Sequence, residues 1–168
     1  IGLGTEFALS AGLFQAFNEM ITTALLFIGF GVVAYATGES DTRKIGGLIG
    51  YYPKTAIIIL IAGLSMAGVP PLAGFQSKLM LVQASLSCGF PELSLLAIIV
   101  SIATFVVFVR AFYKIFLSPK PNDLEIANTH IPRTVLFTMV ILFIIIIVVG
   151  FVPGLITDGI FQYVGGLF

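Results

Sequence analysis

The stretch that decides the fold is Ser65-Met66-Ala67-Gly68-Val69-Pro70-Pro71-Leu72-Ala73-Gly74-Phe75-Gln76-Ser77-Lys78. It lies in the middle of an apolar segment, residues 55–87, which as one helix would be about 50 Å long, against about 30 Å for a membrane core. Pro70 and Pro71 remove two backbone donors and clash with the preceding turn, while the glycines beside them allow a bend. The sequence therefore predicts one helix that is broken near residues 68–75.

Apolar segments continue outward from this run on both sides. Besides residues 55–87, the long apolar runs are residues 7–36, 93–117 and 133–151. Each is about as long as, or longer than, the roughly 20 residues that a membrane span requires. The chain is 58% hydrophobic and 10% charged, whereas soluble domains carry roughly 25% charged residues. We therefore predict an all-α integral membrane fold with about four transmembrane helices, the second of them broken. The tail, residues 152–168, is too short to span again and is predicted to be a short interfacial helix.

The basic residues predict the topology. Residues 37–53 and 118–132 form polar loops, and the turn around residues 87–91 contains no Lys or Arg. Most basic residues lie in or beside the two loops, namely Arg43, Lys44, Lys54, Arg110, Lys114, Lys120 and Arg133. Positively charged loops stay on the cytoplasmic side. Both loops are therefore predicted to be cytoplasmic (or in the matrix), with both termini on the opposite side.

Lys78 follows the predicted break directly. Counting back from Cys88 places it about 15 Å below the outer surface, close to the membrane midplane. A lysine at that depth costs about 2.5–3.5 kcal/mol even on lenient insertion scales. Two interpretations follow: an ionisable group on an ion path, or a structural lysine bonded to carbonyls that the break leaves free.

A second buried charge, Glu19, lies about 18 Å into the first helix. Gln15, Glu19 and Thr23 recur every four residues, and Asn18 lies beside them, so the apolar helix carries a polar stripe that faces protein and not lipid. The opposite charges of Glu19 and Lys78 suggest a pair, in which the proton affinity of each group depends on the other. Such a pair could act as a proton relay or as a static lock between helices.

Other kinds of site find no support in the sequence. The net charge is zero, so no nucleic-acid partner is expected. One cysteine, Cys88, and one histidine, His130, are too few for a metal site. Neither a nucleophile with its base nor a nucleotide loop is present, so we expect no cofactor and no catalytic residues in this chain.

The run 65–78 resembles the signature broken helix of the antiporter-like membrane subunits of respiratory complex I, Mrp cation/proton antiporters and membrane-bound hydrogenases. Residues 17–27, 45–53, 101–116 and 149–153 resemble neighbouring parts of the same subunits. The resemblance implies that this chain, which begins at Ile1 without an initiator methionine, corresponds to the C-terminal four helices of a larger or split subunit. Its implied partners are other membrane subunits, among them the missing N-terminal helices, together with lipid.

The resemblance also implies a function and its residues. Lys78 corresponds to the family's ion-path lysine, and the broken helix around it supplies Pro70, Pro71, Gly74 and Ser77. At two positions the chain departs from the family, with Glu19 where the family has histidine and Thr23 where it has lysine. The implied function is proton or sodium translocation as a non-redox module of a membrane-bound redox complex. The alternatives are a structural subunit with a degraded relay and, without a polar cluster to support it, a small-solute carrier.

Overall fold

The structure, a computed structural model, describes residues 4–121 and 131–166. His130 and most of the predicted loop 118–132 lie outside these ranges. The described elements are all helical: α1 (Glu6–Thr37), the 3₁₀ turn η1 (Leu48–Gly50), α2 (Pro53–Ala67), α3 (Ala73–Ser87), α4 (Pro91–Phe112), the π-helical turn η2 (Tyr113–Leu117), α5 (Arg133–Phe151) and α6 (Gly154–Gly165). The predicted all-α fold with a broken second segment is confirmed.

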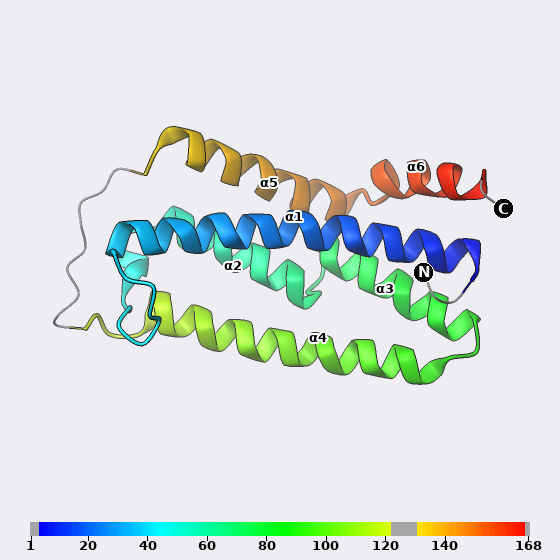
Figure 1. The fold of residues 1–168 in the computed structure, drawn as a ribbon, viewed down its shortest axis with the longest axis horizontal. Helices are drawn as coiled ribbons and strands as arrows, with labels where there is room; N and C mark the ends of the chain where they lie inside the picture. Colours follow the sequence, from blue (N-terminus) through cyan, green and yellow to red (C-terminus); the bar gives the residue numbers. More distant parts are fainter. Residues whose placement is uncertain (1–3, 122–130, 167–168) are drawn as a thin grey trace.

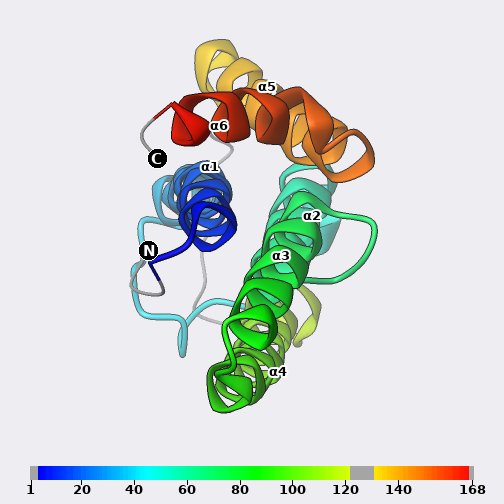
Figure 2. The same ribbon diagram turned by 90° about the vertical axis from the view of Figure 1, so that its right-hand side faces the viewer.

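The helices form an elongated bundle around α1. Helices α2 and α3 follow one another along the bundle, and α1 packs against both of them (Figure 1). Helix α4 lies on one side of α2 and α3, whereas α5 and α6 lie on the other (Figure 2). The α1–α2 loop and the end of η2 share one end of the bundle, below called the loop end. The start of α1, the α3–α4 turn and the end of α6 lie at the opposite end, the turn end.

Three helical segments are long and apolar enough to cross a membrane by length and composition: Glu6–Thr37, Pro91–Leu117 and Arg133–Phe151. Helix α2 is a shorter apolar helix, and α3 continues it after the break. Within this chain α4 buries little of its surface, and apolar side chains such as Leu95, Leu96 and Val107 are exposed along it. Because water would be a poor solvent for such a surface, this exposed face suits lipid or other membrane helices.

Local signals account for the bounds of α1. Thr5 is its N-cap residue, and its hydroxyl oxygen accepts a hydrogen bond from the backbone N–H of Ala8 at 3.3 Å. The helix ends at Gly38, whose φ of 66° is the left-handed conformation that glycine adopts without strain.

At the turn end, Phe7 of α1 stacks on Phe161 of α6 with ring centroids 6.0 Å apart. The tail is therefore helical as predicted and packs on the first turns of α1.

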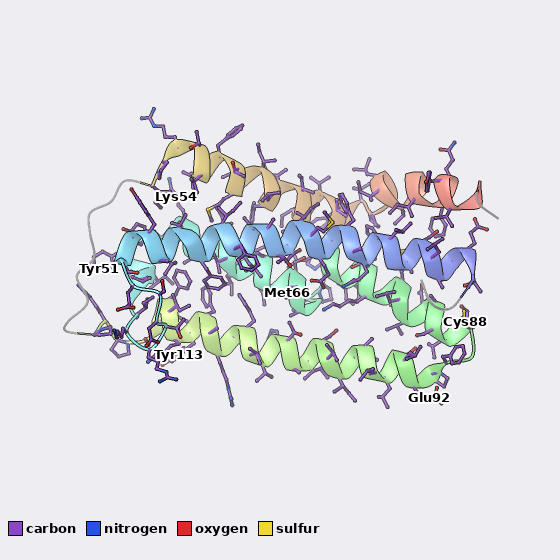
Figure 3. All side chains as sticks on the ribbon, viewed as in Figure 1. Tyr51, Lys54, Met66, Cys88, Glu92 and Tyr113 are labelled. Carbon is purple, nitrogen blue, oxygen red and sulfur yellow. The ribbon has the colours of Figure 1, made fainter. Side chains whose placement is uncertain are left out.

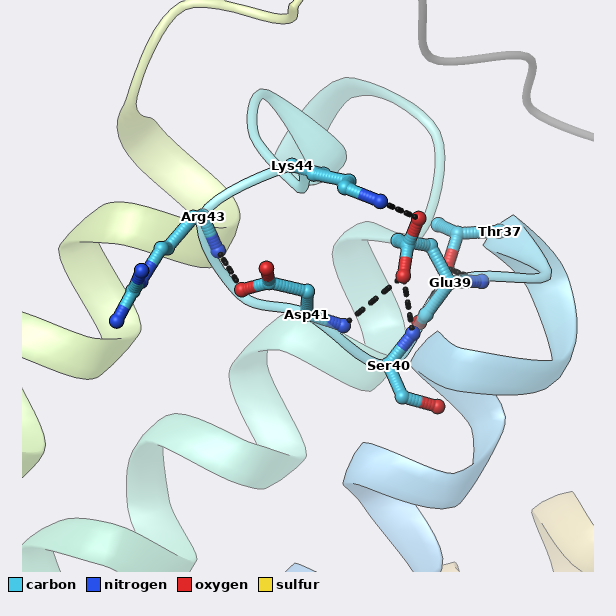
Figure 4. A network of polar contacts seen from close by, with 6 residues as sticks. All are labelled: Thr37, Glu39, Ser40, Asp41, Arg43 and Lys44. Carbon is cyan, nitrogen blue, oxygen red and sulfur yellow. Dashed lines mark hydrogen bonds and ion pairs between the residues drawn. The ribbon is translucent and has the colours of Figure 1, made fainter.

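Glu39 orders the loop that leaves α1. Its carboxylate accepts hydrogen bonds from the backbone N–H groups of Ser40 and Asp41, each at 3.1 Å, and pairs with the Lys44 ammonium at 3.2 Å (Figure 4). The bond from Asp41, followed by that from Lys44, holds the pKa of the Glu39 carboxyl below its ordinary value. The carboxylate therefore keeps its charge, and with it these bonds, to a lower pH than an ordinary glutamate would.

Candidate functional site

The end of α2 leaves a carbonyl group without a helical partner. Gly68, with φ of 85°, closes the helix: its N–H bonds to the Ser65 carbonyl, and the N–H of Val69 bonds to the Leu64 carbonyl, both at 2.9 Å. This capping motif leaves the Met66 carbonyl free. The Lys78 ammonium donates to that oxygen at 2.5 Å and places a positive charge at the negative end of the α2 dipole.

Met66 locates this contact along the bundle. Figure 3 shows Tyr51, Lys54 and Tyr113 toward the loop end, Cys88 and Glu92 at the turn end, and Met66 between the two groups. The Lys78 ammonium, which is hydrogen-bonded to the Met66 carbonyl, therefore lies about midway along the length of the helical bundle. Lys78 itself is half-buried.

The two halves of the broken helix touch backbone to backbone. The N–H of Gly74 in the first turn of α3 donates to the Ser65 hydroxyl of α2 at 3.2 Å. A Cβ atom at position 74 would lie 1.8 Å from the Ser65 carbonyl oxygen, so no residue other than glycine fits. The link between the halves contains Pro70 and Pro71, which are both exposed. The glycine in the predicted motif is thus explained by close packing.

Residues of α1, α3 and α5 contact the backbone of the break. Asn18, buried on α1, donates from its amide nitrogen to the Ala73 carbonyl at 3.2 Å. Ser77, also buried, donates to the Gly74 carbonyl at 3.2 Å. On α5, a Cβ atom at Gly150 would lie 2.4 Å from the Pro71 carbonyl oxygen. Because these partners are backbone groups, the break is a fixed part of the fold.

Glu19 and Lys78 face one cavity but do not form the direct pair that their charges suggest. The Glu19 carboxylate accepts a hydrogen bond from the Gln15 amide nitrogen at 2.7 Å, and no Glu19–Lys78 contact within 4.0 Å is present. Both residues line a cavity of about 350 Å³ between α1, α3 and α4, together with Gln15, Ser101 and Thr104. The two charged groups therefore make no direct contact, although both side chains line one cavity, and their role as a relay or as a lock stays a prediction.

Lys78 also lines a second cavity, of about 480 Å³. The walls of this cavity are almost entirely apolar and come from the end of α2, the first turns of α3, and α4, with Phe75, Ile98 and Phe105 among them. The lysine thus lies at the boundary between a mainly apolar space and the space that contains Glu19.

A known membrane-protein family matches most of the chain that builds this site. The family described as NADH:quinone oxidoreductase/Mrp antiporter, transmembrane, matches residues 1–114. The chain belongs to this family. It is accordingly an integral membrane protein, as its apolar helices also indicate. The family resemblance predicted from the run 65–78 is confirmed.

Relatives of this antiporter-family chain are longer than the chain itself. An uncharacterized protein of Methanocaldococcus jannaschii is 38% identical over 165 residues, which are 97% of this chain and 34% of that protein. A Na+/H+ antiporter subunit of Alkalihalophilus pseudofirmus is 34% identical over 161 residues, which are 89% of this chain and 20% of that protein. The chain thus spans about a third or less of the length of these relatives.

Solved structures show the same fold. A chain of the Mrp complex from Dietzia sp. DQ12-45-1b matches with a TM-score of 0.89 at 21% identity, over 98% of this chain and 39% of that one. A chain of respiratory complex I from Thermus thermophilus matches with a TM-score of 0.81 at 23% identity, over 96% of this chain and 34% of that one. At these identities the likeness concerns the fold alone.

The family pattern and the structure differ in what they reveal of the site. Thr23, at the position where the family resemblance implies a lysine, is half-buried and lines neither cavity beside Lys78. Ser101 and Thr104 of α4 do line the Glu19 cavity, and sequence reasoning missed both. Their signal was two hydroxyls, three residues apart, in the middle of an apolar stretch of α4. Among the described residues, no group of three or more His, Cys, Asp and Glu side chains is placed to hold a metal.

Proposed function

We propose that this chain is an antiporter-like module that moves protons or sodium ions across the membrane, with Lys78 and Glu19 as ionisable groups on the path. One observation carries the proposal: an ammonium and a carboxylate face the same cavity beside a broken helix, midway along the bundle. Ionisable groups at that depth are costly, and broken helices supply the free backbone groups that ion sites use. The family and the relatives' names support the same function.

The module works with further subunits in this proposal. Other membrane helices, among them those that the longer relatives carry, cover the exposed face of α4 and complete the path, and lipid covers the rest. Redox or other energy-supplying chemistry belongs to partner subunits, so this chain contributes ion movement and no active site of its own. The full extent 1–168 acts as a single membrane unit.

A specific observation favours a second function, that of a structural subunit. The Lys78 ammonium caps the Met66 carbonyl at 2.5 Å, and this contact alone explains a lysine at the break. The loss of a basic residue at Thr23 agrees with a degraded relay. In that case Lys78 stabilises the broken helix and moves no ion.

Ion movement by the assembled full-length protein in liposomes separates the two functions. Lys78→Ala is expected to abolish ion movement while the complex still assembles and the partner subunits still turn over, because the path loses an ionisable group. The matched control is Lys54→Ala, which removes an exposed lysine at the loop end of the same segment and is expected to leave ion movement at the wild-type rate. Wild-type ion movement in an assembled Lys78→Ala protein would establish the structural role.

The sidedness is part of the proposal. The loop end carries seven of the eight Lys and Arg residues, Lys78 being the eighth, and we place it on the cytoplasmic (or matrix) side with both ends of the chain opposite. The single cysteine of this chain, Cys88, lies at the turn end. In a full-length protein that lacks other cysteines, a membrane-impermeant maleimide added outside intact cells is expected to label Cys88. Ser40→Cys combined with Cys88→Ser is expected to resist the reagent, and the reverse pattern would invert the topology.

A further inference from the structure

A third cavity, of about 380 Å³, lies at the loop end of the bundle, between the last turns of α1, the loop that follows it, and the end of α4 with η2. Helix α1 packs against α2, α3, α5 and α6, whereas α4 packs against α2 and α3. The cavity therefore lies where two membrane spans approach without packing closely on each other. Its volume is within the range of about 300–1,000 Å³ that ligand pockets have in general.

The helices supply apolar walls to this cavity, and the loop supplies polar ones. The apolar side chains from α1, α4 and η2 include those of Phe30, Val33, Ala111 and Ile115. Glu39 and Thr42 are among the polar residues of the loop. The Glu39 charge is already compensated, because its carboxylate pairs with the Lys44 ammonium and accepts hydrogen bonds from two backbone N–H groups. A fitting ligand therefore has an apolar part between the helices and a polar part at the loop.

Three basic side chains border the cavity. Arg43, Arg110 and Lys114 are all exposed, and each is the chain neighbour of a residue that lines the cavity. Arg43 points away from the Glu39–Lys44 pair (Figure 4). That pair is the one ion pair between described residues, so none of the three basic groups is paired with a described carboxylate. A negatively charged ligand group would compensate them.

Two exposed tyrosines indicate that the cavity lies at the level of the membrane surface. Tyr35 is in the last turn of α1, and Tyr113 begins η2 at the loop end (Figure 3). Tyrosine is enriched where a membrane meets water, because its ring is apolar and its hydroxyl polar. In the π-helical turn η2, the Ser118 N–H bonds to the Tyr113 carbonyl at 2.9 Å, and such turns are frequent at functional sites.

We propose that this cavity binds an anionic phospholipid of the surrounding membrane, with a hydrocarbon chain between α1 and α4 and the phosphate group beside Arg43, Arg110 and Lys114. Guanidinium and ammonium groups form charge-assisted hydrogen bonds with phosphate, and apolar walls are covered best by hydrocarbon. A free anion would leave the walls uncovered, and an uncharged hydrocarbon would leave the basic groups uncompensated. The lipid site is independent of ion movement by this chain.

Photolabelling of the full-length protein in its membrane assembly tests the site. The probe is phosphatidylglycerol with a diazirine in its hydrocarbon chain, added to assemblies in phosphatidylcholine bilayers, and mass spectrometry locates the adduct. Peptides that contain residues 30–34 and 111–115 are expected to be labelled. Unlabelled phosphatidylglycerol is expected to displace the probe, whereas phosphatidylcholine or inorganic phosphate at the same concentration is expected to leave the labelling unchanged.

Two variants separate the headgroup from the chain. Arg110→Gln combined with Lys114→Gln is expected to raise the probe concentration for half-maximal labelling by about tenfold, because two charges that face the phosphate are lost. Ala111→Phe fills the cavity and keeps all three basic groups, and is expected to abolish labelling of these peptides. The matched control, Lys54→Gln combined with Arg133→Gln, removes the same charge from exposed positions at the loop end outside the cavity, and is expected to label as the wild type does.

Four results would overturn the lipid site. Displacement by inorganic phosphate would show a site for a free anion, and equal displacement by phosphatidylcholine would show lipid contact without selectivity. The same loss in the control pair as in Arg110→Gln with Lys114→Gln would show attraction to surface charge in general. Absence of labelling in an assembled wild-type protein would show that other membrane helices cover the cavity.

Melting temperature supplies a second measurement, since a ligand that binds only the folded state raises it. Phosphatidylglycerol is expected to stabilise the wild type and the control pair over phosphatidylcholine, and to lose this effect in Arg110→Gln with Lys114→Gln. Because both changes are at exposed positions, the variant is expected to fold and assemble. Equal melting of the wild type in the two lipids would overturn the site as well.

Discussion

Gly74→Ala is expected to destabilise the full-length protein by about 3 kcal/mol, because the added methyl group meets backbone that cannot move aside. The new Cβ would lie 1.8 Å from the Ser65 carbonyl oxygen and 2.7 Å from its carbon. The two halves of the broken helix would have to separate, and the hydrogen bond from the Gly74 N–H to the Ser65 hydroxyl at 3.2 Å would be lost with the contact. Thermal unfolding in detergent, with the melting temperature as readout, measures the effect.

Two further variants define the cause of that loss. Gly31→Ala, on α1, adds a methyl group with no atom within 4 Å, and is expected to leave stability unchanged or raise it by up to about 1 kcal/mol. Gly74→Ala combined with Ser65→Ala is expected to remain as unstable as Gly74→Ala alone, since the clash is with the main chain. A melting temperature for Gly74→Ala equal to that of the wild type would show that α2 and α3 are not packed backbone to backbone.

The fold was predictable because its main signals are local. Two prolines between glycines stop a helix wherever they occur, and apolar length sets the spans. The placement of Lys78 about midway along the bundle followed from counting residues at a fixed rise per residue. The capping of the Met66 carbonyl was anticipated in kind, as a lysine bonded to a freed carbonyl, but its partner could not be named. Which carbonyl stays free depends on how Gly68 closes the helix.

The candidate site was less predictable because it depends on helix rotation. The stripe of Gln15, Asn18 and Glu19 marked one face of α1, but its members have different surroundings in the structure. Asn18 donates a hydrogen bond to the Ala73 carbonyl at the break, while Gln15 and Glu19 line the cavity. Helix α4 is apolar on nearly every side, so no periodicity indicated that Ser101 and Thr104 face Glu19. The opposite charges of Glu19 and Lys78 likewise suggested contact. In the structure the Glu19 carboxylate instead accepts a hydrogen bond from the Gln15 amide, and the Lys78 ammonium donates to the Met66 carbonyl.

Neutralising Glu19 and Lys78 together is expected to leave ion movement abolished, as in either single variant. Glu19→Gln removes the carboxylate from the path and Lys78→Met removes the ammonium, so a relay that needs both fails in all three proteins. The free energy of unfolding of the two single variants and the double variant tests whether Glu19 and Lys78 act as a static lock between helices. Because the two groups do not touch, their coupling free energy is expected to stay below the about 3–5 kcal/mol that breaking a direct buried pair costs.

The double-mutant cycle therefore separates relay from lock by two independent readouts, liposome ion movement and melting temperature. For a lock, each single variant loses several kcal/mol, the double variant recovers most of it, and ion movement survives in whichever proteins assemble. For a relay, the stabilities add and ion movement vanishes throughout. The geometry favours the relay, because a lock requires contact, and here the ammonium lies on the Met66 carbonyl and the carboxylate on the Gln15 amide. Recovery of both stability and ion movement in the double variant would contradict this interpretation.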